Sequence, residues 1–445
     1  MKISVVGLGY LGAVHAAAMA SLGHEVVGVD IDQARVGALQ AGRAPFFEPG
    51  FQELLDQVLP TGRLAFSTEI ADVAGASVHF ICVGTPQSED SGRANVSYVE
   101  TSVAGVAKAV AASGRPHIIV GKSTVPVGTA ENLAAWLRTA APNVTLIWNP
   151  EFLREGFAVA DSLHPDRLVY GVEPGPAGEQ AATVLDAVYQ PILAAGTPRL
   201  VMDFASAQLV KAAANSFLAM KISFINAMAV LCDATGGDVT QLAQAIGLDD
   251  RIGPKFLRAG LGFGGGCLPK DVRALVARAE ELGLGETFEF LRCVDQLNTS
   301  QRARVAATVA QAVGGDLAGK RIAVLGLAFK PNSDDIRDSP ALSAAQALAG
   351  LGARVVAYDP AVGQRATQQV PGLAVAGSAV EAATGADAVL VGTEWPEFRS
   401  MDPGQLAGVV AAPVVVDGRN CLDPAAWAAA GWRYWGIGRH HPQYA

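Results

Sequence analysis

Short apolar runs alternate with longer helix-forming stretches in the first part of the chain. The runs at residues 2–6, 25–29, 78–83, 117–120 and 145–148 are rich in β-branched residues and show little polar alternation. Runs of this kind are typical of parallel strands that are buried on both faces. Strands that alternate with helices predict a doubly wound α/β sheet.

The same pattern returns after residue 319. Apolar runs at 321–325, 354–358, 388–391 and 414–416 are again separated by helix formers. The segments also correspond in sequence, KISVVGLGY with RIAVLGLAF and GHEVVGVDID with GARVVAYDPA. We therefore predict two related Rossmann-like α/β domains, one at each end of the chain.

The middle of the chain has a different character. Residues 205–234 contain no Gly or Pro, which predicts one long helix closed by Thr235-Gly236-Gly237, and helical sequence continues to about residue 312. The predicted domains are 1–204, a helical region 205–312, and 313–445. A long apolar helix between two domains is either a dimer surface or a buried element of one subunit, and the sequence leaves both open.

Composition narrows the function classes. The chain has 445 residues, of which 50% are hydrophobic and 17% charged, so it is expected to fold around large cores. The formal net charge of −9 argues against a general nucleic-acid binder.

No membrane association is expected either. The apolar stretch from Phe204 to Cys232 is broken by polar residues, among them Lys211 and Asn215. The N-terminus runs directly into a strand and lacks the features of a signal peptide. Five cysteines without a pairing pattern favour reduced thiols and a cytoplasmic location, and no Cys/His cluster has the spacing of a metal site.

A glycine turn follows the first predicted strand. Gly7, Gly9 and Gly12 form the pattern GxGxxG between a strand and a helix expected at 13–22. The glycines permit a tight turn, backbone approach to a pyrophosphate and close helix packing, with the phosphates at the helix N-terminus. Asp30 ends the next strand, where an acid receives ribose hydroxyls and favours NAD over NADP. The alternative is a glycine turn beside an unrelated acid.

The corresponding turn of the second domain lacks this pattern. Gly326-Leu327-Ala328 has one glycine where the first domain has three, so a second dinucleotide is not expected there. Lys330 and Arg337 flank that turn as candidate phosphate contacts, or as ordinary surface charges.

The most unusual segment is GLGFGGGCLPKD at 260–271, with five glycines in seven residues. The glycines would let the backbone approach a ligand closely. Pro269 suits the first position of a helix, which places Cys267 at a helix N-terminus beside Lys270. Both features favour the thiolate and make Cys267 a candidate nucleophile, with Asp271 placed to orient water or a proton. Cys82 and Cys232 lie in apolar contexts and are expected in the core.

Two pairs of polar residues share a spacing of four. Lys211 and Asn215 fall on one face of the predicted long helix, where they would stabilise a developing oxyanion or belong to a solvated face. Glu151 and Glu155 form either a ligand-binding and acid/base pair or part of a surface helix. Thr124 follows a buried strand, at the end that faces the ligand crevice in a doubly wound sheet.

Taken in order, these segments resemble the UDP-glucose/GDP-mannose dehydrogenase family over nearly the whole chain. The resemblance is carried by GLGYLG, VGTP, STVPVGT, NPEFLREG, HPDR, KAAANSFLAMKISFIN, GFGGGCLPKD, GLAFKPNSDDIRDSP and DGRN. It implies NAD-dependent four-electron oxidation of a nucleotide-sugar C6 alcohol to a carboxylate, through a cysteine thiohemiacetal and thioester. UDP-glucose is the expected substrate, and a homodimer through the central helix is expected.

The resemblance also implies roles for individual residues. The implied catalytic residues are Cys267, Lys211, Asn215, Asp271, Glu155 and Thr124. The implied cofactor contacts are Gly7, Gly9, Tyr10, Leu11, Gly12, Asp30, Arg35, Thr85, Thr124, Lys270 and Arg337. The implied substrate contacts are Glu151, Phe152, Leu153, Arg154, Glu155, Lys211, Asn215, Phe256, Leu257, Arg258, Ala259, Gly260, Gly264 and Lys330. Either Glu155 or Asp271 would activate the water that hydrolyses the thioester.

Three positions depart from the family pattern. Gly266 stands where Ser is common, Leu268 where UDP-glucose enzymes commonly have Phe, and Arg35 where Lys is common. Leu268 also occurs in GDP-mannose enzymes, whereas HPDR and DGRN favour UDP-glucose. The alternatives are the same oxidation of GDP-mannose or a UDP-N-acetylhexosamine, a non-catalytic nucleotide-sugar-binding protein, and an NAD-dependent epimerase or reductase. The last would not need the glycine-flanked thiol.

Overall fold

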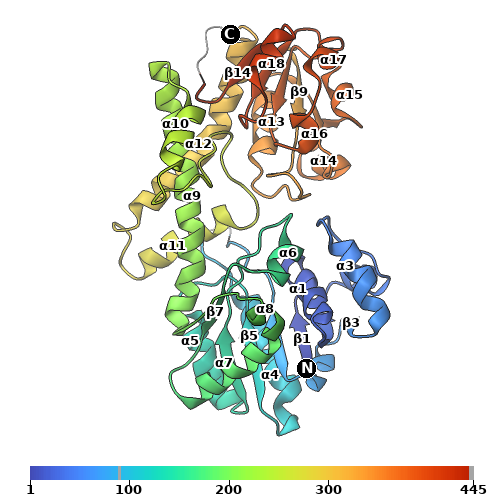
Figure 1. Ribbon diagram of the computed structural model, residues 1–445, viewed down its shortest axis with the longest axis vertical. Coiled ribbons are helices and arrows are strands. Elements are labelled where there is room, and N and C mark those ends of the chain that lie inside the picture. The colour runs from blue at the N-terminus through green and yellow to red at the C-terminus, as the bar shows by residue number, and fades with distance from the viewer. Residues whose placement is uncertain (89–91, 440–445) are drawn as a thin grey trace. The chain divides into compact units, whose positions relative to one another are not determined.

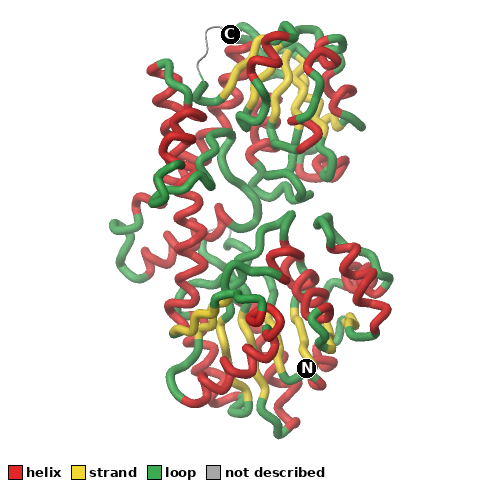
Figure 2. Tube along the Cα trace, viewed as in Figure 1, coloured by secondary structure: helices red, strands yellow, loops and turns green. Residues whose placement is uncertain are grey.

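The computed structural model describes residues 1–88 and 92–439 and divides into two compact units (Figure 1). Unit 1 comprises Met1–Ala214 and Ala277–Gly283, and unit 2 comprises Asn215–Val276 and the chain from Leu284 onwards. Each unit has one sheet with helices packed around it (Figure 2).

The sheet of unit 1 has eight strands in the order β3-β2-β1-β4-β5-β6-β7-β8. They are β1 Lys2–Val6, β2 Glu25–Val29, β3 Leu64–Ser67, β4 Val78–Ile81, β5 His117–Gly121, β6 Val144–Trp148, β7 Leu168–Gly171 and β8 Arg199–Met202. Neighbouring strands are parallel except β6 and β7, which pair antiparallel. The order reverses between β1 and β4, and the carboxyl ends at such a switch point form the ligand crevice of doubly wound sheets.

The helices of unit 1 pack with apolar faces on this sheet. In α4, Val99, Val103, Val106 and Val110 recur at helical spacing and are buried. The helices are α1 Tyr10–Ser21, α2 Gln33–Gln40, α3 Phe51–Val58, α4 Ser97–Val110, α5 Thr129–Ala140, α6 Ala158–Leu163, α7 Pro176–Val188 and α8 Gln190–Ala194. Short 3-10 turns lie at η1 Leu59–Thr61, η2 Ile70–Gly75 and η3 Ala111–Ser113.

Unit 2 repeats the arrangement with six parallel strands in the order β11-β10-β9-β12-β13-β14. They are β9 Arg321–Leu325, β10 Arg354–Tyr358, β11 Ala374–Val375, β12 Ala388–Val391, β13 Val414–Asp417 and β14 Arg433–Gly436. The helices are α10 Val239–Gly247, α12 Glu289–Ala312, α13 Pro340–Gly350, α14 Ala366–Gln369, α15 Ala379–Ala383, α16 Pro396–Arg399, α17 Pro403–Ala407 and α18 Pro424–Ala429, with η4 at Gly363–Arg365. Helices α9 Phe204–Thr235 and α11 Leu268–Glu281 contribute residues to both units.

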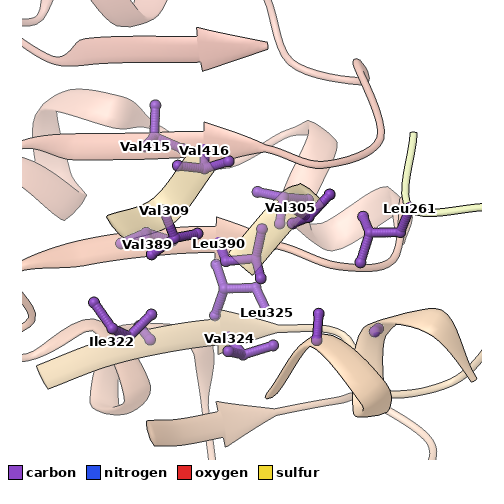
Figure 3. Close-up of a cluster of buried hydrophobic side chains, with 14 of the residues drawn as sticks. Leu261, Val305, Val309, Ile322, Val324, Leu325, Val389, Leu390, Val415 and Val416 are labelled. Carbon is purple, nitrogen blue, oxygen red and sulfur yellow. The ribbon is translucent and has the colours of Figure 1, made fainter. Parts of the chain in front are cut away.

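The middle region shares one core with the second sheet. Val305 and Val309 of α12 lie among the buried side chains of β9 and β12 (Figure 3). Leu261, from the glycine segment, belongs to the same cluster and is fully buried. The segment that leads to Cys267 is therefore anchored in the interior of unit 2.

The predicted α/β architecture is confirmed, with two differences at the level of elements. Helix α1 begins at Tyr10 rather than at residue 13, because the last glycine of the turn already lies in its first turn. Strands β3, β7, β8, β11 and β14 were not predicted. Four of them, β3, β8, β11 and β14, are edge strands with exposed positions, unlike the equally short but fully buried β4, β12 and β13, whose apolar runs were recognised.

The long central helix is confirmed as α9, and Gly236 follows it at φ 77°. Among the described residues it is the one helix that is long and apolar enough to cross a membrane, with a mean hydropathy of 1.6 over its best window. This is weak evidence for a span, because a long core helix passes the same test. The helix also carries Lys211 and Asn215, whose side chains are buried and engaged by other polar groups.

Candidate active site

The glycine turn of unit 1 has the geometry of a phosphate-binding turn. Gly7 has φ 92°, and a Cβ there would lie 2.8 Å from the backbone N of Val83, while one at Gly12 would lie 1.8 Å from the Gly7 carbonyl oxygen. A Cβ at Gly9, by contrast, meets no described atom within 4 Å. The N-cap residue Gly9 supplies no side-chain cap to α1, and the first N–H groups of a helix are suited to bind an anion. The turn therefore fits a dinucleotide pyrophosphate.

Asp30 lies where the ribose acid is expected, and its carboxylate already has protein partners. It accepts hydrogen bonds from the Leu8 amide at 2.6 Å and the Asp32 amide at 2.9 Å. Arg35 of α2 pairs with it at 3.1 Å and with Asp32 at 3.3 Å. Asp30 and Arg35, predicted separately, are thus brought together beside the turn.

The equivalent acid of unit 2 explains why that turn differs. Asp359 ends β10 and is 3% exposed. It accepts bonds from the amides of Leu327 and Ala328, and from the indole N–H of Trp395 at 3.1 Å. Two further amides, those of Ala361 and Val362, bond its other oxygen. With five protein donors the Asp359 carboxylate is more fully engaged by the fold than that of Asp30, which has two amides and one guanidinium as partners.

The loops after β4 and β5 are joined to each other. Thr85 donates its hydroxyl to the Thr124 carbonyl at 2.7 Å, and Ser123 donates to the Val83 carbonyl at 2.6 Å. Two predicted cofactor-site threonines therefore lie together at the carboxyl edge of the sheet of unit 1.

The segment after β6 holds a buried ion pair. Lys211 Nζ lies 2.9 Å from Glu151 Oε1, with the two side chains 6% and 12% exposed. The ring of Phe152 is close to two cations, with this ammonium 5.8 Å and the Arg167 guanidinium 3.9 Å from its centroid. Glu151 also accepts from the Leu153 amide at 2.6 Å. Lys211, expected to act with Asn215, is thus matched to a carboxylate of the NPEFLREG segment.

That segment is irregular backbone, so the surface-helix alternative for Glu151 and Glu155 is wrong. Arg154 is exposed and forms a forked pair with Asp161, at 2.9 and 2.6 Å. Glu155 is half-buried and precedes Gly156, which has φ 79°.

The cysteine and its polar neighbours belong to unit 2. Cys267 is exposed, directly precedes the first residue of α11, and accepts a bond at its carbonyl from the Asp271 amide at 2.9 Å. Asn215 donates its side-chain amide to Asp271 Oδ2 at 2.6 Å, and Lys270 Nζ lies 2.8 Å from Asp271 Oδ1. Asp271 is 2% exposed. A buried carboxylate is therefore held by a charge and an amide one turn from the thiol.

Glycines are required before Cys267 because neighbouring atoms of the protein leave no room for a Cβ. A Cβ at Gly262 would meet Asn298 Oδ1 at 2.4 Å, and one at Gly265 would meet the Phe329 ring at 2.7 Å. At Gly264 it would lie 2.3 Å from the Asp338 carbonyl oxygen. We expected these glycines to admit a ligand. In unit 2 they admit neighbouring loops, which fix the path of the chain that carries the thiol.

Gly266, which replaces the common Ser, has a different neighbour. A Cβ there would lie 2.4 Å from Cζ of Arg337, the far end of a flexible side chain. Arg337 itself is exposed and forks onto Asp335. The absence of a side chain at Gly266 therefore sets where the Arg337 guanidinium lies.

Arg419 of the DGRN segment joins three loops of unit 2. Its guanidinium donates to the carbonyls of Gly392 at 2.8 Å, Gly262 at 3.0 Å and Phe329 at 3.3 Å. It thus ties the glycine segment to the ends of β9 and β12.

The remaining predicted substrate residues are also in unit 2. Leu257 and Ala259 are buried, and the Gly260 amide donates to Asn226 at 2.8 Å. Phe256 is exposed at φ 65°, and Arg258 lies 3.8 Å from Glu394. Lys330 lies over the Phe329 ring, 5.2 Å from its centroid. Apart from Lys330, these residues form one continuous segment rather than a cluster of polar groups.

Two buried charged residues near the site were missed by sequence reasoning. Lys122 donates to Asn149 at 3.0 Å and lies 3.5 Å from the Tyr189 hydroxyl, and burial lowers the pKa of its ammonium. Glu48 is 6% exposed and accepts from two backbone amides of the segment that follows Glu155. Two features of the sequence could have identified these residues. Lys122 comes directly after a buried strand, and Glu48 lies between two Phe residues and a Pro-Gly turn.

The glycine turn after β1, the acid after β2 and a parallel sheet of this strand order define a dinucleotide-binding protein of the Rossmann class. Comparisons with known proteins narrow the class. Residues 1–193, 205–300 and 323–424 match the NAD binding, central and UDP binding domains of the UDP-glucose/GDP-mannose dehydrogenase family. The chain belongs to this family, as its motifs predicted.

Individual relatives are similar over their whole length. A UDP-glucose 6-dehydrogenase of Rhizobium meliloti is 43% identical, covering 99% of this chain and 100% of that protein. One of Pseudomonas aeruginosa is 41% identical, covering 99% and 98%. The solved UDP-glucose dehydrogenase of Pyrobaculum islandicum is 39% identical with a TM-score of 0.88, covering 99% and 98% of the two chains. The match to the NAD binding domain confirms NAD as cofactor, and that to the UDP binding domain supports a UDP-sugar substrate.

Proposed function

We propose that this protein oxidises the C6 alcohol of UDP-glucose to the carboxylate of UDP-glucuronate with two NAD. The observation that carries the proposal is the exposed Cys267 at the start of α11, one turn before a buried Asp271 that is held by Asn215. A dehydrogenase that stopped at the aldehyde, an epimerase or a reductase would not need this thiol. UDP-glucose 6-dehydrogenases at 43% and 41% identity support the choice of sugar.

Each predicted domain has its own part in binding or catalysis. We assign the dinucleotide to 1–204, the thiol and the long helix to 205–312, and the UDP moiety to 313–445. Cofactor contacts come from the glycine turn, Asp30, Arg35, Thr85 and Thr124, and from Lys270 and Arg337. Substrate contacts come from the Glu151–Glu155 segment, the Phe256–Gly260 segment, Gly264 and Lys330. Bound NAD supplies a hydride acceptor for each of the two oxidations.

The residues of the chain then have distinct tasks. Lys211 and Asn215 donate hydrogen bonds to the oxygen that gains charge, and Thr124 is assigned the same role. Cys267 Sγ adds to the aldehyde carbon and afterwards holds the sugar as a thioester. Glu155 or Asp271 orients and deprotonates the water that releases the carboxylate.

The deciding experiment measures NADH formed per nucleotide sugar consumed. Two NADH per UDP-glucose, with little from GDP-mannose or UDP-N-acetylglucosamine, would establish the reaction and the sugar. Two NADH from another nucleotide sugar would support the same four-electron oxidation and would make that sugar the substrate. That second outcome has a structural precedent, since a UDP-D-ManNAc dehydrogenase of Pyrococcus horikoshii is 28% identical with a TM-score of 0.85. NAD binding without any NADH would favour the nucleotide-sugar-binding alternative.

We also infer a cytoplasmic homodimer that forms through α9. Phe217, Phe224 and Leu231 recur every seven residues on this helix and are 58%, 49% and 55% exposed. An apolar stripe of this kind is favourable only when it is covered, and a second copy offers a matching stripe. Sedimentation of the protein and of Phe224→Glu tests this, since the variant should become monomeric if the stripe is the interface.

A further inference from the structure

A buried carboxylate holds the backbone that follows Glu155. Glu48, in the loop before α3, is 6% exposed and lies 108 residues from its partner in sequence. Its Oε2 accepts from the Gly156 amide at 2.7 Å, and its Oε1 accepts from the Ala158 amide at 2.6 Å. Short bonds from backbone N–H groups to an ionised carboxylate are the strong kind, and they close a rigid bridge between two distant loops.

The hydrogen bond from the Gly156 amide to Glu48 also affects Glu155, the residue before Gly156. The Gly156 amide belongs to the same rigid peptide plane as the Glu155 carbonyl. An acceptor that fixes this plane fixes the position of the Glu155 Cα and so limits the directions in which its side chain can leave the backbone. Gly156 itself sits at φ 79°, a conformation that this bond helps to maintain.

The dinucleotide turn takes part in the same contact. The Tyr10 hydroxyl oxygen accepts a second bond from the Gly156 amide, at 2.7 Å. Tyr10 is the first residue of α1 and lies inside the glycine pattern. Its ring packs on Phe46, with centroids 4.9 Å apart, and Phe46 stacks on Phe51 at 5.2 Å. The Tyr10 ring is therefore held in an aromatic cluster, and its hydroxyl belongs to the first residue of the helix that follows the glycine turn.

We propose that Glu48 is a positioning residue that sets the orientation of Glu155, and that Tyr10 links this orientation to the dinucleotide turn. The assignment rests on the proposed function, in which Glu155 acts on the substrate or on the hydrolytic water. Glu48 acts through the backbone and is not itself a catalytic residue.

The test uses Glu48→Gln in the full-length protein. The amide keeps the size of the side chain but turns one acceptor into a donor that faces a backbone N–H. We expect kcat to fall about 100-fold, the scale of a misplaced catalytic group, while the Kd for NAD stays within about twofold. Glu53→Gln is the matched control, because Glu53 is exposed in the first turn of α3, five positions along the chain. It should behave as the unaltered protein.

A double-mutant cycle separates positioning from a general structural role. In a Glu155→Gln background, Glu48→Gln should change kcat by no more than about twofold, because the group it positions is already gone. Tyr10→Phe keeps the ring on Phe46 and removes the acceptor, so it should cost less than Glu48→Gln. A full further 100-fold loss in the Glu155→Gln background would overturn the proposal.

A readout that does not depend on the sugar completes the test. Amide hydrogen exchange at Gly156 and Ala158 in the NAD-loaded protein should be faster in Glu48→Gln than in Glu53→Gln. Equal protection in the two variants would overturn the proposal even if the enzyme oxidises UDP-glucose. If the unaltered protein oxidises no nucleotide sugar, the proposed function fails, and the exchange rates still decide whether Glu48 holds this segment.

Discussion

Asn215 and Asp271 form a buried pair, in which the side-chain amide donates to the carboxylate at 2.6 Å. They come from α9 and α11, 56 residues apart in sequence. Lys270 neutralises the other carboxylate oxygen at 2.8 Å. The pair therefore fixes how a negative charge and an amide are presented one turn after Cys267.

Removal of the Asp271 charge should lower the reaction rate while the protein stays folded. Asp271→Asn keeps the shape and a hydrogen bond to Asn215, but removes the negative charge that lies 2.8 Å from the Lys270 ammonium. We expect kcat for carboxylate formation to fall between about 10- and 1000-fold, the range of a lost acid/base or electrostatic contribution. Stopped-flow NADH formation measures this, and a rate within twofold of the unaltered protein would remove Asp271 from the chemistry.

Loss of the thiol should stop carboxylate formation without loss of the fold. Cys267 is exposed at the start of α11, so Cys267→Ala creates no cavity in the core. We expect NAD to bind normally and the thermal midpoint to move by no more than about 2 °C. Chromatography of the product is the measurement, and UDP-glucuronate formed at the original rate would contradict the thioester scheme.

The Glu151–Lys211 pair should matter for stability as well as for catalysis. Lys211→Met removes one partner of an ion pair whose side chains are 6% and 12% exposed, and leaves a nearly buried carboxylate. Such a change typically costs about 3–5 kcal/mol. In the double variant Lys211→Met with Glu151→Gln much of that loss should return, as measured by urea unfolding. An equal loss in the single and double variants would show that the unpaired Glu151 carboxylate is not the cause of the loss.

The interior of unit 1 should be sensitive to acid. Ser4, His79, His117 and Ser113 form a chain of hydrogen bonds at 2.7, 3.1 and 2.8 Å. Burial lowers the pKa of His79 to about 3, and burial together with Arg115 lowers the pKa of His117. Because the unfolded chain binds protons at these rings near pH 6.5 and the folded chain does not, stability should be complete above pH 6.5 and fall as the pH drops towards 3.

The variant His79→Gln tests this dependence. It keeps a hydrogen-bonding side chain and removes one titrating ring, so the free energy of unfolding should lose about one proton's worth of pH dependence between pH 6.5 and 4. Urea unfolding at a series of pH values is the measurement. An unchanged slope would show that His79 does not carry the acid sensitivity.

Cofactor choice should depend on the Asp30–Arg35 pair. Asp30 holds the guanidinium at 3.1 Å, and in Asp30→Ala this cation would keep only Asp32 of its two carboxylate partners and would be more available to a 2′-phosphate. The ratio of kcat/KM for NAD to that for NADP should fall by at least about tenfold. Because the Leu8 amide also loses its acceptor, Asp30→Asn serves as the control that retains this bond. An unchanged ratio in both variants would exclude Asp30 from the ribose contact.

Much of the fold was readable from local pattern. Buried parallel strands are continuous apolar runs, and the turns that follow them carry glycines because tight backbone leaves no room for a Cβ, as at Gly7 and Gly326. The long helix α9 was predicted to within a residue at each end because it contains no Gly or Pro to interrupt a helix. Strands such as β3 and β11 were missed because they lie at the edges of their sheets and have exposed positions, so they lack the continuous buried run of the inner strands.

Residues with special local settings could be recognised without the fold: the glycine turn, Asp30 at a strand end and Cys267 before a helix. Which distant polar groups meet depends on how the chain packs. Lys211 pairs with Glu151, Asn215 with Asp271, and Glu48 with the Gly156 amide. The physical reason is that a turn or helix start is set by adjacent residues, whereas a buried charge is satisfied by whatever donor the packing of sheets and helices brings within about 3 Å.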